Sequence, residues 1–219
     1  MRLILFAIIG GGFLTFNGYQ EFVVSSNTKS TPSKVKVEDI EKGKKIDNNY
    51  VQLEKHIALI GGCVYSARLK KGEYAIQNSS KLEYVYYPVI SYNNPFLLKQ
   101  EELINKFGSY EAIPQKLLPK FSDIKVMIKS NIYDTVGSIP AEVDHKDSFK
   151  GLVINSIDSI KSDEAALLRQ SFPGLNVSKV IIIEQNRKPS STMMSMLMMA
   201  GGVLIIVGGG AWGLKSLKS

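Results

Sequence analysis

The chain is apolar at both ends and polar in between. Residues 3–16 read LILFAIIGGGFLTF and residues 193–214 read MMSMLMMAGGVLIIVGGGAWGL, and neither stretch contains a charged residue. Every acidic residue of the chain lies between these two stretches. The pattern predicts a soluble domain that is joined to one membrane at two points.

The C-terminal apolar stretch is long enough to cross a bilayer. A transmembrane helix needs about 20 apolar residues, and residues 193–214 provide 22, with Ser195 as the only hydroxyl. The alternative is a buried core helix, which is rarely uncharged on every face over this length. We therefore expect a transmembrane helix over 193–214.

The N-terminal stretch is shorter. Its 14 uncharged residues rise about 21 Å as a helix, and adding Asn17, Gly18 and Tyr19 brings it to the lower limit for a span. The alternative is a cleaved signal peptide, but the following NGYQEF lacks a small-x-small cleavage site. We expect residues 1–19 to be an uncleaved transmembrane anchor.

These assignments divide the chain into six parts: the anchor (1–19), a polar linker (20–34), an extracytoplasmic α+β domain (35–185), a juxtamembrane segment (186–192), the second span (193–214) and a basic tail (215–219). Arg2, Lys215 and Lys218 favour cytoplasmic termini, although Arg187 and Lys188 on the other side oppose this. We expect the protein in the inner or plasma membrane of the cell, with the central domain outside the cytoplasm.

Glycines in both apolar stretches suggest helix packing. Small residues let membrane helices approach closely and gain van der Waals contact, although glycine is also generally common in such helices. The expected packing residues are Gly10, Gly11, Gly12, Gly209 and Gly213, and the expected partner is the other span or another subunit.

The central segment mixes strand and helix patterns. Residues 35–53 alternate weakly, residues 56–69 are rich in β-branched residues, and residues 82–90 read as a strand whose end Pro88 weakens. A helix is expected after Asn93-Asn94-Pro95 up to Gly108, and another from Ser162, as its cap, to Pro173-Gly174. With strands at 123–130 and 180–183, the fold class is an α+β domain with a mixed β-sheet and two or three helices.

Composition narrows the function classes. The net charge is +7, but the basic residues are mostly scattered lysines, unlike the clustered Arg, Lys and aromatic faces of nucleic-acid readers. We expect no nucleic-acid binding, and a basic face towards anionic lipid is more plausible. Cys63 is the only cysteine, so no internal disulfide can form, and it is expected to be a buried thiol.

No catalytic motif is present, and no cofactor is expected. His145 lies near Glu142, Asp144 and Asp147, residue types that bind metals, but such a cluster on a polar loop is usually a solvated turn. His56 is expected at the end of a strand.

Tyrosines gather in and after the strand at 82–90: Tyr84, Tyr86, Tyr87 and Tyr92. An interaction surface is one interpretation, because tyrosine combines a large ring with a polar hydroxyl. The alternative is packing within a half-buried sheet. In an extended strand Tyr84 and Tyr86 share one face, and Tyr87 lies on the other.

In layout alone the chain resembles two families of doubly anchored membrane proteins, the assembly factors of respiratory oxidase and the mitochondrial membrane ubiquitin ligases. The expected function is non-enzymatic: a scaffold, assembly or sensing role in a membrane complex, with the lipid bilayer and other membrane subunits or a second copy as partners. The alternatives are an envelope hydrolase or transferase with a dispersed site, and a sensor domain for a small molecule or lipid.

Overall fold

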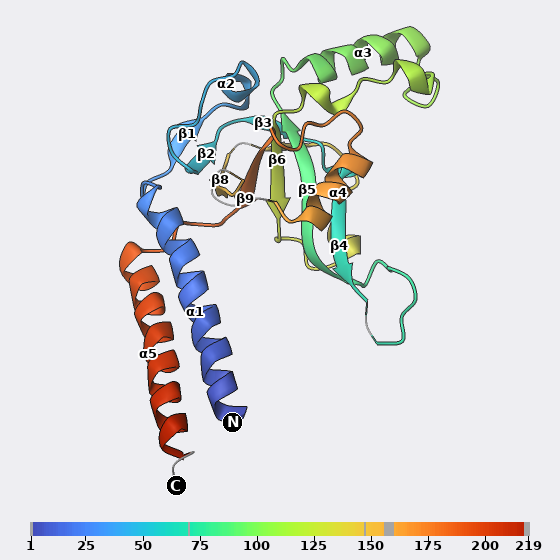
Figure 1. Cartoon of the computed structure of the whole chain (residues 1–219). Helices are drawn as coiled ribbons and strands as arrows, with labels where there is room; N and C mark the ends of the chain where they lie inside the picture. Colours follow the sequence, from blue (N-terminus) through green and yellow to red (C-terminus); the bar gives the residue numbers. More distant parts are fainter. Residues whose placement is uncertain (1, 70, 147, 156–159, 217–219) are drawn as a thin grey trace. The chain divides into compact units, whose positions relative to one another are not determined.

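The structure is a computed structural model that describes residues 2–69, 71–146, 148–155 and 160–216 (Figure 1). The chain forms two compact units. One contains Met1–Thr31 and Lys188–Ser219, and the other contains Pro32–Arg187. We call them the helix pair and the sheet domain.

The helix pair consists of α1 (Arg2–Ser26) and α5 (Thr192–Ser216). Each helix has 25 residues and is therefore about 37 Å long at 1.5 Å per residue. α1 continues beyond the apolar stretch through Asn17, Gln20 and Glu21, so the first part of the segment expected to be a linker is helical. Within the described residues, one helical stretch, Thr192–Ala211, meets the length and composition of a membrane span.

The sheet domain contains all the strands of the described residues. They are β1 (Ser33–Val35), β2 (Tyr50–Leu53), β3 (His56–Ala58), β4 (Val64–Arg68), β5 (Lys81–Ile90), β6 (Val126–Ser130), β7 (Asp144–Lys146), β8 (Phe149–Val153) and β9 (Ile181–Gln185). Its α-helices are α2 (Val37–Glu41), α3 (Pro95–Phe107) and α4 (Ser162–Ser171). Short 3-10 helices lie at Ile60–Gly62, Gln115–Leu117, Phe121–Asp123 and Val136–Ser138.

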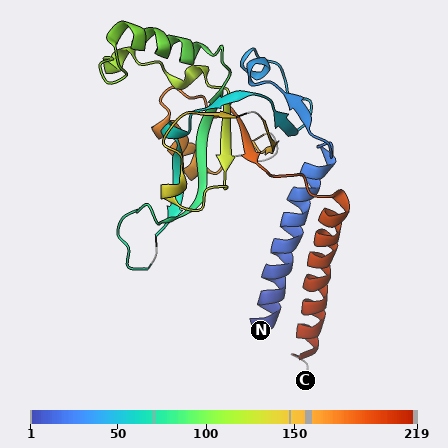
Figure 2. The ribbon, with the colours of Figure 1, turned by 180° about the vertical axis from the view of Figure 1, so that it is seen from behind.

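The strands form one curled, mixed sheet (Figure 1 and Figure 2). The strand order is β1-β2-β8-β9-β6-β5-β3-β7, and β4 pairs with β5. The pairs β1–β2 and β6–β9 are parallel, and the others are antiparallel. A mixed α/β domain with several helices is therefore confirmed.

Alternation along the strands divides the core into two clusters. In β6, Val126 and Ile128 belong to a cluster that includes residues of α2, whereas Met127 belongs to a cluster with Leu168 and Phe172, from α4 and its C-terminal end. Successive side chains of a strand point to opposite faces. The sheet is therefore covered on both sides, and its central strand β6 buries four of its five residues.

Most of the expected elements are present, with two corrections. The expected strand at 82–90 is confirmed and runs through Pro88 to Ile90, where the Pro88 carbonyl accepts from the Leu59 amide at 2.9 Å. Part of the weakly alternating segment 35–53 forms the short helix α2. Ser162 is the first residue of α4, and the N-cap is Lys161, without a capping side chain.

Candidate functional site

The two long helices approach each other backbone to backbone. A Cβ atom on Gly11 would lie 2.6 Å from the carbonyl oxygen of Gly202, and a Cβ on Gly202 would lie 2.6 Å from that of Gly11. A Cβ on Gly209 would overlap the Ala7 methyl group, and one on Gly18 would lie 2.8 Å from the amide of Met199. The order of these contacts makes the pair antiparallel.

The expected packing glycines are only partly at this contact. Gly11 and Gly209 lie in it, whereas Cβ atoms on Gly10 and Gly12 would meet no described atom within 4 Å. Gly213 lies outside the residues whose side chains are described. Consecutive glycines lie on different faces of each helix, because successive residues are rotated by about 100° around the helix axis.

Two glycines of this contact, Gly18 and Gly202, were not predicted from the sequence. Gly18 follows Gly11 by seven residues, and Gly209 follows Gly202 by seven. Seven residues are close to two helical turns, so each pair lies on one face. A search for glycines at this spacing would have found the contact, whereas the runs of adjacent glycines drew attention away from it.

Large apolar side chains cover the opposite faces of both helices. On α1, Phe6 is 73% and Phe13 is 71% exposed; on α5, Leu204 is 71% and Val207 is 62% exposed. Exposed apolar surface of this kind marks a face that meets lipid or another protein.

Polar side chains of α1 bond within the helix pair. Thr15 Oγ1 donates to the Gly11 carbonyl at 2.8 Å, and Asn17 Nδ2 donates to the Phe13 carbonyl at 2.7 Å. At the end of the pair, Ser190 Oγ donates to Glu21 Oε2 at 2.6 Å. Internal bonding of this kind lowers the cost of placing polar groups in an apolar environment.

A buried charged cluster lies between the sheet and α4. The Tyr86 hydroxyl donates to Glu164 Oε2 at 2.5 Å, and Lys129 Nζ donates to both Glu164 oxygens at 3.0 and 3.1 Å. The Lys129 ammonium lies 4.7 Å from the centroid of the Tyr84 ring. The Glu164 side chain is 5% exposed. Burial, and then the bond to Glu164 and its charge, raise the pKa of Tyr86 far above its ordinary value, so the phenol remains a donor.

The tyrosines therefore do not form one surface. Tyr86 and Tyr87 are 0% and 1% exposed, and the expectation of an interaction surface is wrong for both, because β5 lies inside a sheet covered on both faces. Tyr84 and Tyr86 do share a face, with ring centroids 5.4 Å apart. Tyr84 is half-buried, and Tyr92 is 47% exposed.

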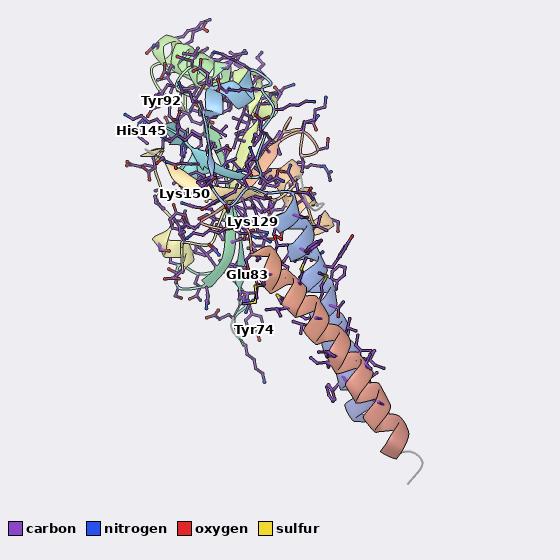
Figure 3. All side chains as sticks on the ribbon, turned by 90° about the vertical axis from the view of Figure 1, so that its left-hand side faces the viewer. Tyr74, Glu83, Tyr92, Lys129, His145 and Lys150 are labelled. Atoms are coloured by element: carbon purple, nitrogen blue, oxygen red, sulfur yellow. The ribbon has the colours of Figure 1, made fainter. Side chains whose placement is uncertain are left out.

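Tyr92 contacts the histidine of the weak metal candidate (Figure 3). Its ring stacks on His145 with centroids 5.8 Å apart, and the Tyr92 hydroxyl lies 3.3 Å from His145 Nδ1. Asp144 is in β7 with His145, and Asp147 lies outside the described residues. Among the described residues, no three His, Cys, Asp or Glu side chains come together as metal ligands.

His56 and Cys63 both pack inside the sheet domain. His56 is the first residue of β3, is fully buried, and places Nδ1 2.8 Å from the Glu54 carbonyl oxygen. Cys63 was expected to be buried but is half-buried, and it packs against the cluster that contains Val126. Burial raises the pKa of its thiol, which disfavours the nucleophilic thiolate.

One open cleft of about 500 Å³ lies beside the edge strand β1. Five of its eleven lining residues are charged, three lysines and two glutamates: Lys34, Lys36, Val37, Glu38, Gln52, Glu54, Lys55, Ser91, Tyr92, Asn93 and Ser148. Lys42 Nζ lies 2.6 Å from Glu38, whereas the three lining lysines have no ion pair with any described residue. The hydrolase interpretation required Glu142, Asp144 and Asp147 at a pocket. Glu142 and Asp144 do not line this one, and Asp147 lies outside the described residues.

A partly buried network supports one wall of the cleft. Glu41 accepts from the Ser91 amide at 3.0 Å, from the Ser91 hydroxyl at 2.5 Å and from Asn94 Nδ2 at 2.6 Å. Asn94 also caps α3, because its Oδ1 accepts from the Phe96 amide at 2.8 Å. The segment with Tyr92 and Asn93 is therefore held at both sides.

Comparison with known proteins identifies no relative. No protein-family model matches the chain, and neither the curated proteins nor the solved structures contain a match.

Proposed function

We propose that this protein is an integral membrane protein of non-enzymatic type, anchored by both α1 and α5, whose sheet domain scaffolds or assembles a membrane complex. The single observation that carries the anchor is the inverted packing of the helix pair. Glycines occupy the contact, and large apolar side chains such as Phe13 and Leu204 face outward. Lipid is the surrounding in which this arrangement is favourable.

The connections limit how far the domain can move from the bilayer. Six residues separate the end of α1 at Ser26 from the start of β1 at Ser33, and six separate the end of β9 at Gln185 from the start of α5 at Thr192. Six extended residues reach at most about 20 Å. Two such connections favour a domain held at the membrane surface, with both chain termini on the other side of the bilayer and in the cytoplasm.

Outward-facing substitutions test the anchor. An aspartate at a helix centre costs about 2.5–3.5 kcal/mol of insertion free energy, so Phe13→Asp and Leu204→Asp should each weaken membrane retention, measured by alkaline extraction of cell membranes. The matched controls are Phe13→Leu and Leu204→Phe. Unchanged retention of the double aspartate variant would overturn the proposal. The intact mass of the purified protein tests whether residues 1–19 are retained.

The scaffold role predicts a stable assembly. Extraction in mild detergent followed by sizing and mass spectrometry should return the protein with other membrane subunits or with a second copy. Recovery of monomer alone would contradict this role and leave the anchor intact.

A second function is favoured by the cleft beside β1, namely sensing of a small anionic ligand. Lys34, Lys36 and Lys55 have no ion pair among the described residues and line one cleft, so their charges can attract an anion. Inorganic phosphate and glycerol phosphate should then raise the melting temperature of the full chain. The triple variant Lys34→Gln/Lys36→Gln/Lys55→Gln should lose this shift, while Lys99→Gln/Lys106→Gln/Lys116→Gln should keep it. Equal shifts in both variants would exclude the cleft.

A further inference from the structure

The β4–β5 hairpin extends beyond the sheet. β5 begins at Lys81, four residues before its first pair with β6 at Val85, and Lys81 pairs with Arg68 at the end of β4. The base of the hairpin is tied by Glu83, which accepts from Arg68 Nε at 2.6 Å and from Ser66 Oγ at 2.9 Å. Asn78 and Ser80 are also held, because their carbonyls accept from the Gly137 amide at 2.8 Å and the Val136 amide at 3.1 Å. The tip, described at residues 69 and 71–77, therefore extends from a firmly paired base.

The tip carries exposed apolar side chains. Tyr74 is 98% exposed, Leu69 is 48% exposed and Ile76 is 49% exposed. The exposed Lys71 lies between Leu69 and Tyr74, next to the half-buried Glu73, and the exposed Lys81 follows Ile76. An aromatic ring, two aliphatic chains and flanking ammonium groups are the side chains that favour the boundary between headgroups and acyl chains.

Strand register places the tip at the end of the domain where the chain leaves for the helices. Gln185 pairs with Gly151, Gly151 with Val51, and Val51 with Ser33, so the end of β9 and the start of β1 are level. β9 is parallel to β6, which is antiparallel to β5. β9 therefore runs towards the end at which β5 begins. In Figure 3, Tyr74 and Tyr92 lie at opposite ends of the sheet domain.

We propose that the hairpin tip inserts Leu69, Tyr74 and Ile76 into the interfacial region of the bilayer that holds α5. This inference rests on the proposed membrane anchor. The six-residue connection after Gln185 keeps the tip near the bilayer at high effective concentration. Shallow insertion of these three side chains is therefore enough to hold the tip on the membrane. Lys71 and Lys81 complement anionic headgroups. The hairpin thus acts as a third contact that fixes the orientation of the domain on the membrane.

Depth-dependent quenching tests the contact. In a Cys63→Ala background, Tyr74→Cys is labelled with an environment-sensitive fluorophore, and the full chain is reconstituted into vesicles of phosphatidylcholine and phosphatidylglycerol. The expected result is a blue-shifted emission that nitroxide lipids labelled near the headgroup quench. The matched control is Tyr92→Cys, which should remain in a water-like environment and unquenched.

The outcomes separate the hairpin from the anchor. Leu204→Cys on α5 reports the anchor and should be quenched by nitroxide on the acyl chains. Quenching at 204 without quenching at 74, or equal quenching at 74 and 92, would overturn the hairpin contact alone. Loss of quenching at 204 would overturn the anchor. A blue-shifted emission at position 74 in native membranes but not in vesicles would assign the tip to a protein partner. This result would also overturn the lipid contact.

Discussion

The helix pair and the sheet domain bury opposite kinds of residue. In the sheet domain, Met127, Leu168 and Ile182 are fully buried, as water requires of large apolar side chains. In the helix pair, Gly11 and Gly202 are buried, while Leu204 is 71% exposed. One chain therefore contains two packing rules, and this difference supports the lipid environment that we propose for the helix pair.

Matched leucine truncations give the largest expected contrast. Leu168→Ala removes a fully buried side chain of α4 and should lower the free energy of unfolding by about 2–5 kcal/mol. Leu204→Ala should change it by less than about 0.5 kcal/mol, because an exposed position leaves no cavity. Urea unfolding of the full chain in detergent micelles, followed by tyrosine fluorescence, measures both. Equal losses would contradict the inverted packing of α5.

The sheet domain contains a largely buried ion pair between Lys129 and Glu164. Lys129→Met leaves the Glu164 carboxylate, 5% exposed, with Tyr86 as its remaining bonded partner among those described above. Removing one partner of a buried pair costs about 3–5 kcal/mol, and the partial exposure of Lys129 places the expected loss near the lower end. The double variant Lys129→Met/Glu164→Gln should recover part of it in the same unfolding measurement. A double variant as unstable as the single one would show that Lys129 acts through packing alone.

Glycine substitutions test the contact of the helix pair. Gly202→Leu forces a side chain against the Gly11 carbonyl and should cost about 1–3 kcal/mol of packing. Gly208→Leu is the matched control, because a Cβ there meets no described atom within 4 Å. Disulfide formation between Leu14→Cys and Gly201→Cys, in a Cys63→Ala background, reports the pairing in membranes. Similar crosslinking in both leucine variants would place the contact elsewhere.

Local patterns in the sequence predicted the local features of the fold. Asn94 and Pro95 begin α3, and Gly108, with a φ of 85°, ends it, because a cap, a fixed φ and a left-handed residue act within a few positions. The short helix α2 was missed, since its five residues lie within the weakly alternating segment 35–53. It is held by the core cluster that Val37 and Ile40 join. Propensity alone does not predict such a helix.

Features that depend on long-range pairing could not be predicted. Lys129 and Glu164 are 35 residues apart in the chain, and neither carries a local signal of the other. The cleft joins Lys34, Lys55 and Ser148 only because β2 pairs with both β1 and β8. The tyrosines were ambiguous for the same reason: alternation assigns each to a face, but only the complete sheet shows that both faces are covered.

The smallest expected effect is a pH dependence within the sheet domain. Tyr86→Phe keeps the ring and removes the bond to Glu164, which should cost about 1 kcal/mol at neutral pH. The pKa of Tyr86 is raised by folding, so the unfolded chain loses the phenol proton first. The stabilisation is therefore complete below the unfolded pKa, near 10, and declines as the pH rises above it, by up to about 1.4 kcal/mol per pH unit. Unfolding measured from pH 8 to 11.5 should show a steeper alkaline decline for the unsubstituted protein than for Tyr86→Phe, so the difference between them shrinks. Parallel declines would mean that the Tyr86 hydroxyl is accessible to water. The bond between Tyr86 and Glu164 would then no longer be evidence that the core of the sheet domain excludes water, in contrast to the apolar exterior of the helix pair.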